Sequence, residues 1–296
     1  MVRKEILGPI RVPFLALTPA CVLLGLGTAV RTAGSVSTFH VVLALVGAIS
    51  AHISVNAFNE YFDFKSGLDA RTERTPFSGG SGVLPKNPEM ARTALTVAMI
   101  ALTFTGLLGI YFSFVRGITL LPLGVLGLFI IVAYTPWLTR HPVLCLIAPG
   151  LGFGPLMVMG THFVLTGQYS WVAFFVSMVP FFLVSDLLLL NQFPDTEADQ
   201  SVGRRHILIV LGRPHGSLIY SLFLVLAYLT ILAGVYWEYL PKASLLGLAT
   251  LVIAIPVSLG TMRYAENTPK LVPYLGLNVL INLATLVLVA VGLFVG

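Results

Sequence analysis

Charged residues are scarce in this chain. Only 10% of its 296 residues are Asp, Glu, Lys or Arg, and 57% are hydrophobic, whereas a soluble domain usually carries about 25% charged residues. Together with a mean hydropathy of +0.93, this composition excludes a soluble globular domain and places the protein in a lipid bilayer. Because apolar runs extend from Pro13 to Phe294, we expect one integral-membrane domain over residues 1–296.

Cysteine is almost absent as well. Cys21 and Cys145 both lie inside apolar runs, which excludes a disulfide framework and a zinc-ligand pattern. The net charge of +5 is positive, and we attribute it to basic loops on the inner membrane surface rather than to nucleic-acid binding. We therefore expect no nucleic-acid partner.

Long apolar runs are abundant, and they set the predicted fold. A helix needs about 20 apolar residues to cross a bilayer, and nine stretches meet this requirement. They lie near residues 11–31, 36–58, 92–115, 117–135, 142–166, 170–191, 214–236, 241–262 and 272–295. The sequence thus predicts an all-α, polytopic membrane protein with nine transmembrane helices.

Charge is distributed unevenly between the two sides of these spans. With the N-terminus inside, only Arg31, Arg116 and Lys242 of the 17 lysines and arginines fall in outer segments. Of the 12 acidic residues, only Glu238 falls outside and only Asp186 lies within a span. Because inner loops carry the excess of basic residues, we predict a cytoplasmic N-terminus and a cytoplasm-facing site in the cell membrane.

A first polar cluster, Asn59–Asp69, follows the second apolar span. Residues three or four positions apart share a helix face, and this spacing predicts a polar stripe made of His52, Asn56, Asn59 and Asp63. Asp69 lies six positions beyond Asp63 and joins the stripe only if the helix breaks at Ser66-Gly67.

A second polar cluster follows the sixth span. Asn191, Asp195 and Asp199 recur at steps of four, which places them on one helix face, and Pro194 can be tolerated near a helix start or a kink. Taken alone, this segment is typical of a solvated cytoplasmic loop, but two matched clusters favour two pseudo-repeated halves. We expect the loops 59–91 and 191–213 to cap one site. The glycine-rich stretch of residues 76–82 is either a lid, with backbone amides facing an anion, or a plain connector.

Clustered carboxylates repel one another and need a compensating cation. Mg²⁺ prefers oxygen ligands and is commonly held by one or two carboxylates plus substrate phosphates. We predict Asp63, Asp69, Asp195 and Asp199 as catalytic metal ligands. Asn59 and Asn191 would add amide oxygens or orient the carboxylates. Arginine suits bidentate phosphate binding, and the candidate phosphate contacts are Lys65, Arg71, Arg74, Arg140, Arg204 and Arg205.

Ionisation of an allylic prenyl diphosphate uses Mg²⁺ and a diphosphate beside an apolar cavity, and metal ions would stabilise the leaving group. Aromatic faces stabilise a cation by about 0.5–2 kcal/mol each. The candidates are Tyr61, Phe62, Tyr134 and Trp137, which otherwise are interfacial packing residues. We take Tyr134 as a substrate contact.

Asn59-x-x-x-Asp63-x-x-x-x-x-Asp69 and Asp195-x-x-x-Asp199, set in nine spans, resemble the UbiA superfamily of intramembrane prenyltransferases. Within that superfamily, the chain most resembles the menaquinone-pathway dihydroxynaphthoate prenyltransferases. Residues 61–69, 153–167 and 195–212 carry this closer resemblance. The resemblance implies helices around a central cavity, Mg²⁺ dependence, and attack of an aromatic quinone precursor on a prenyl cation. The chain departs from the family pattern at Glu60, Gln192, Pro194 and His206.

Some alternatives stay open at this point. Asp186, a carboxyl inside a span, is a functional candidate by default. It is either a hydrogen-bond partner or proton acceptor for the ring nucleophile, or a buried carboxyl that pairs with a polar neighbour such as His52 or Asn56. We also predict His52 and Asn56 as substrate-binding residues. The chain could instead prenylate a hydroxybenzoate or a glycerol-phosphate lipid. A transporter with matched halves is a remote alternative, because both clusters lie at the inner face.

Overall fold

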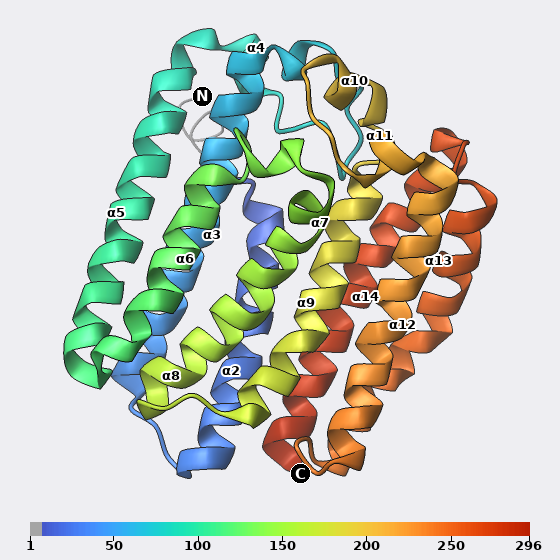
Figure 1. Cartoon of the computed structure of the whole chain (residues 1–296). Coiled ribbons are helices and arrows are strands. Elements are labelled where there is room, and N and C mark those ends of the chain that lie inside the picture. The colour runs from blue at the N-terminus through green and yellow to red at the C-terminus, as the bar shows by residue number, and fades with distance from the viewer. Residues whose placement is uncertain (1–7) are drawn as a thin grey trace.

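The computed structural model describes residues 8–296, and these residues form helices and connecting turns without any strand (Figure 1). A π-helical segment, Gly152–Met159, joins two of the helices. The helices are α2 (Leu17–Ala33), α3 (Thr38–Ser66), α4 (Val83–Lys86), α5 (Ala91–Arg116), α6 (Leu121–Ala133), α7 (Pro142–Leu151), α8 (Gly160–Thr166), α9 (Trp171–Asn191), α10 (Thr196–Ser201), α11 (Ile207–Leu211), α12 (Arg213–Tyr236), α13 (Leu251–Arg263) and α14 (Thr268–Val295). The all-α prediction is confirmed.

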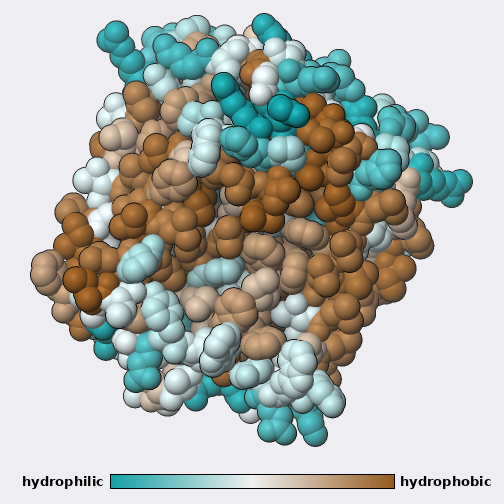
Figure 2. Space-filling view, viewed as in Figure 1, coloured by the Kyte–Doolittle hydropathy of each residue, from teal (hydrophilic) through white to brown (hydrophobic). Residues whose placement is uncertain are grey.

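Eight helical segments of the described chain are long and apolar enough to cross a membrane. They correspond to eight of the nine predicted spans. The remaining one, predicted at 117–135, forms the shorter apolar helix Ile118–Ala133. Hydrophobic residues cover the middle of the molecule in Figure 2, and hydrophilic residues lie toward both ends, most of them at the top. This surface suits a protein embedded in a bilayer, while the count of nine crossings stays a prediction.

The two long loops lie at the same end of the helix bundle. In Figure 1, α4 from the first loop lies at the same end as α10 and α11 from the second, and the C-terminus lies at the opposite end. Arg11 pairs with Glu60 at the end of α3, so the start of the described chain lies at the loop end. An odd number of crossings therefore separates Arg11 from the C-terminus, as nine spans require.

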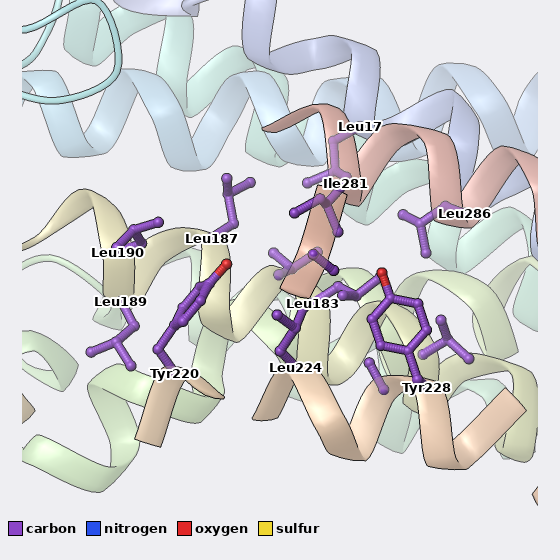
Figure 3. Close-up of a cluster of buried hydrophobic side chains, with 14 of the residues drawn as sticks. Leu17, Leu183, Leu187, Leu189, Leu190, Tyr220, Leu224, Tyr228, Ile281 and Leu286 are labelled. Atoms are coloured by element: carbon purple, nitrogen blue, oxygen red, sulfur yellow. The ribbon is translucent and has the colours of Figure 1, made fainter. Parts of the chain in front are cut away.

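The largest cluster of buried hydrophobic side chains in the described chain includes residues of α9, α12 and α14. Leu183 and Leu187 of α9 pack there with Tyr220 and Leu224 of α12 and with Ile281 of α14 (Figure 3). On the other side, α7 and the π-helical segment approach α9 very closely. A Cβ added at Gly150 or Gly154 would collide with a carbonyl oxygen of α9, so glycine is required at these two contacts.

The helices that carry the two polar clusters end in different ways. Gly67 ends α3 with a φ of 76°, and Asp69 lies on the short 3₁₀ turn that follows, Leu68–Ala70. The predicted helix break at Ser66-Gly67 is therefore confirmed. The single helix face predicted for Asn191, Asp195 and Asp199 is wrong, because α9 ends at Asn191 and α10 begins at Thr196, on either side of Pro194. Pro194, which has no N–H and crowds the preceding turn, falls in the break.

Candidate active site

A cavity of about 780 Å³ runs through the molecule and ends under the two loops. Most of its wall is apolar and comes from α3, α5, α6, the π-helical segment and α9. The polar residues gather at its loop end. All six predicted metal-site residues line it there, namely Asn59, Asp63, Asp69, Asn191, Asp195 and Asp199. The structure thus brings both clusters to one site, although they are more than a hundred residues apart in sequence.

Arg204 connects the two clusters. Its guanidinium pairs with Asp63 at the end of α3, and its Nη1 lies 2.8 Å from Oδ1 of Asp199 in α10. The other oxygen of Asp199 lies 3.1 Å from Nε2 of His206. Burial alone lowers the pKa of Arg204, but the charges of Asp63 and Asp199 together raise it above its ordinary value. In this structure Arg204 is a counter-ion of the carboxylates rather than a free phosphate ligand.

Three buried oxygens of the site have no hydrogen-bond partner among the described residues: Asp69 Oδ2, Asn191 Oδ1 and Asp195 Oδ1. Orphaned buried oxygens are costly, and they are the ligand type that Mg²⁺ prefers. Within residues 8–296, no three His, Cys, Asp or Glu side chains gather closely enough to hold a metal ion alone. The donor set therefore fits Mg²⁺ that takes its remaining ligands from a phosphorylated substrate.

The two orphaned carboxyls have perturbed acidities. Burial raises the pKa of Asp69 to about 7, and the charges of Glu60 and Asp63 add to this shift. Burial and the charge of Asp199 likewise raise the pKa of Asp195 to about 7. Both groups lack a nearby cation strong enough to offset desolvation, and a bound dication would supply one.

The glycine-rich segment lies over this end of the cavity. Ser81 donates from its N–H and its hydroxyl to Glu60, at 2.7 and 2.6 Å. Gly79 donates its N–H to Oδ2 of Asp195, at 3.2 Å. Gly79 and Gly80 line the cavity, and their φ values of 82° and 70° require glycine. The segment is held by both clusters, which favours the lid over the plain connector.

Glu60 and Arg11 are site residues that the sequence analysis missed. The Glu60 side chain is fully buried, and Oε1 accepts from Nε of Arg11 at 2.7 Å as well as from the lid. Arg11 lines the cavity. Two signals pointed to Glu60: it is a third acidic residue within the eleven residues of the first cluster, and it departs from the pattern of the family that the chain resembles.

The polar stripe of α3 makes contacts that differ from those expected. Nδ1 of His52 lies 2.8 Å from Oγ1 of Thr18, and Nδ2 of Asn56 donates to the carbonyl of Ile10 at 2.9 Å. Both side chains line the cavity. The suggested pairing of Asp186 with either of them is wrong. Asp186 is fully buried, its oxygens have no partner among the described residues, and it is absent from the cavity wall.

The other predicted substrate contacts divide into three groups. Tyr134 lines the main cavity. Lys65 and Arg140 line a second, smaller pocket of about 210 Å³, which shares Asp63 and Arg204 with the main cavity. The three remaining residues are exposed and line neither space. They are Arg71, which donates to Ser201, Arg74, which donates to the carbonyl of Gly79, and Arg205.

Comparison with known proteins agrees with this arrangement. The model of the UbiA prenyltransferase family matches residues 18–280. A 1,4-dihydroxy-2-naphthoate octaprenyltransferase of Bacillus subtilis is 26% identical over 62% of this chain and 59% of its own length. A 2-carboxy-1,4-naphthoquinone phytyltransferase of Synechocystis is 23% identical over 90% of this chain and 85% of its own. The match to the first relative thus spans less than two thirds of that protein.

Solved structures share the fold. A UbiA homologue of Aeropyrum pernix aligns with a TM-score of 0.72 at 17% identity, covering 93% of this chain and 96% of its own. A homologue of Archaeoglobus fulgidus, solved with DMAPP and Mg²⁺, aligns with a TM-score of 0.59 at 14% identity over 97% and 99% of the two chains. The helix arrangement is therefore common to these proteins.

Proposed function

This chain belongs to the UbiA prenyltransferase family, and we propose that it transfers a prenyl group from a prenyl diphosphate to an aromatic quinone precursor of the dihydroxynaphthoate class. The reaction depends on Mg²⁺ and releases pyrophosphate. One observation carries this proposal: two aspartate clusters meet at one end of a long apolar cavity. A ligand with an anionic head and an apolar tail suits such a space.

The proposed metal ligands are Asp63 and Asp69 from the first cluster and Asp195 and Asp199 from the second, with Asn59 and Asn191 beside them. When bound, Mg²⁺ would neutralise charge on the departing diphosphate. A homologue from Archaeoglobus fulgidus has been solved with Mg²⁺ and a prenyl diphosphate, which supports this choice of ion. The orphaned oxygens of Asp69, Asn191 and Asp195 support these residues as ligands.

The other residues prepare the space for ionisation. The bond between C1 of the prenyl group and the diphosphate oxygen breaks, and the diphosphate leaves with the electron pair. A ring carbon of the acceptor then bonds to C1. That carbon releases the group that it carried, a proton or a carboxylate leaving as CO2, and the electron pair of the broken bond stays in the ring. The apolar wall and the lid of Gly79–Ser81 exclude water that would capture the cation. Tyr134 lines the cavity near this end and can face the cation.

The second pocket supports an acceptor that carries a carboxylate. Lys65 and Arg140 line it, and it adjoins the main cavity through Asp63 and Arg204. Cations there suit a carboxylate on the aromatic ring. The relatives named as a dihydroxynaphthoate octaprenyltransferase and a carboxynaphthoquinone phytyltransferase support the same class. The predicted orientation places the reaction at the cytoplasmic face of the cell membrane.

Purified protein in nanodiscs, supplied with Mg²⁺, a prenyl diphosphate and dihydroxynaphthoate, should release pyrophosphate and form a prenylated ring. Hydroxybenzoate and a glycerol-phosphate lipid are the comparison acceptors. Asp63→Ala and Asp195→Ala should each abolish the release, whereas the exposed Lys86→Ala should not. If no donor and acceptor pair gives product, or if both aspartate variants remain active, the proposed function is wrong.

A further inference from the structure

The cavity extends along nearly the whole length of α3. Its wall includes residues of α3 from Asp63 back to Leu43. At 1.5 Å per residue, these 20 steps correspond to about 30 Å. The hydrocarbon core of a bilayer is also about 30 Å thick. The end far from the carboxylates, which we call the distal arm, is lined by apolar residues such as Phe112, Leu120 and Leu123.

Four glycines of α5 and α6 line the cavity, and two of them, Gly109 and Gly124, leave open space beside their backbone. A Cβ added at Gly109 or Gly124 would meet no atom within 4 Å. At Gly106 and Gly127 a Cβ would make only ordinary contacts, at 3.7 and 3.9 Å. Glycine in a helix interior is less favourable than alanine, and close helix packing does not require glycine at these positions, in contrast to Gly150. The open space beside Gly109 and Gly124 therefore needs another explanation.

The polar end of the same cavity indicates what kind of ligand uses this space. Asp69 is only 7% exposed, lines the cavity and has an oxygen without a partner among the described residues. A ligand anchored there through an anionic, metal-bound head would direct its apolar tail along α3 toward the glycines. The space therefore suits a long, flexible hydrocarbon chain.

The distal arm also opens sideways. Ile110, Leu121 and Val125 line the cavity and are at the same time 51%, 37% and 63% exposed on the outer surface of the molecule. A chain longer than the cavity can therefore extend past these residues to the outside, instead of meeting a closed floor.

We propose that Gly109 and Gly124 determine how long a prenyl chain this protein accepts on its diphosphate donor. This inference rests on the proposed function, because it assigns the chain length of the same donor. The absence of side chains at these two positions leaves the path through the distal arm open. A short chain ends before reaching them.

The test compares donors of two lengths, octaprenyl and geranyl diphosphate, in Gly109→Leu and Gly124→Leu. The first readout is donor binding by calorimetry in nanodiscs with Mg²⁺ and no acceptor, and the second is turnover. The control is Thr103→Leu, since Thr103 is exposed on α5 and does not line the cavity. We expect octaprenyl affinity to fall about tenfold in the glycine variants, with geranyl affinity and the control unchanged.

The outcomes separate the two proposals. If both glycine variants bind octaprenyl diphosphate as tightly as the wild type does, or if the wild type binds neither donor, the inference is overturned. If the wild type binds both donors and the variants discriminate between them but no acceptor is prenylated, the inference stands and the proposed function fails. Retained geranyl binding shows that a variant is folded. If a leucine variant binds neither donor, the smaller change Gly109→Ala replaces it, because the added Cβ meets no atom of the protein. Gly109→Ala should weaken the binding of octaprenyl diphosphate and leave the binding of geranyl diphosphate unchanged.

Discussion

Replacement of Arg204 by methionine tests whether the two clusters are held together by this one side chain. Arg204 is the cation shared by Asp63 and Asp199, and the side chains of the three residues are only 16%, 8% and 3% exposed. Methionine keeps much of the apolar length of the side chain but removes the charge. The two carboxylates would then face each other without their common counter-ion.

The magnitude follows from the burial of the network. Removing one partner of a buried ion pair costs about 3–5 kcal/mol, because an uncompensated charge stays behind. His206, at 3.1 Å from Asp199, can offset part of the loss. We therefore expect the metal-free Arg204→Met protein to lose about 3 kcal/mol of stability. Mg²⁺ with pyrophosphate brings new cations to the same carboxylates, so most of this loss should disappear when both are present.

Thermal unfolding in detergent, followed by helical circular dichroism, measures this difference in EDTA and in Mg²⁺ with pyrophosphate. Arg71→Met is the matched control, because Arg71 is exposed and donates only to the carbonyl and hydroxyl of Ser201. Its unfolding temperature should not change in either condition. An equal loss of stability for Arg204→Met in both conditions, or no loss in EDTA, would refute the counter-ion role.

Three further predictions concern neighbouring groups. Glu60→Gln weakens the lid's bonds to Ser81 and the pair with Arg11, so the KM for the donor should rise several-fold; an unchanged KM would argue against the lid. The pKa values of Asp69 and Asp195 are raised from 3.8 to about 7. Since the folded protein then holds these protons more tightly than the unfolded chain does, the metal-free protein should lose stability as pH rises from 4 to 7. Mg²⁺ binds the ionised carboxylates, so it should stabilise the protein more at pH 8 than at pH 6. A thermal shift titration with Mg²⁺ at the two pH values checks this. Asp186→Asn should retain turnover, because Asp186 does not line the cavity; a large loss would return it to the mechanism.

Hydropathy was sufficient to locate the membrane helices, because burial in lipid imposes an apolar run of nearly fixed length. The helix break before Asp69 was also predictable, since Gly67 can adopt the positive φ that ends α3. The helix end at Asn191 was not, because proline near a helix start is tolerated and proline just after an end looks the same in sequence. Which side chains pair with one another was the feature that the sequence predicted least well.

Arg11 and Glu60 illustrate this limit. They lie 49 positions apart, and only the packing of α2 beside α3 makes them neighbours. Arg204 was recognised as a cation near the site. Whether it binds a carboxylate or a phosphate depends on which of these groups is present, which the sequence does not show. Similarly, the open space beside Gly109 and Gly124 depends on how α5 and α6 sit together, which a list of small residues does not reveal.

Asp195 has one oxygen bonded to the N–H of Gly79 and one buried oxygen without a partner among the described residues. The Gly79–Ser81 segment and a metal ion could therefore share this carboxylate, one oxygen each, without competing. Any rotation of the carboxylate would disturb both contacts at once. If Asp195 holds Mg²⁺ as proposed, departure of magnesium pyrophosphate and opening of the cavity mouth would be coupled steps of one turnover.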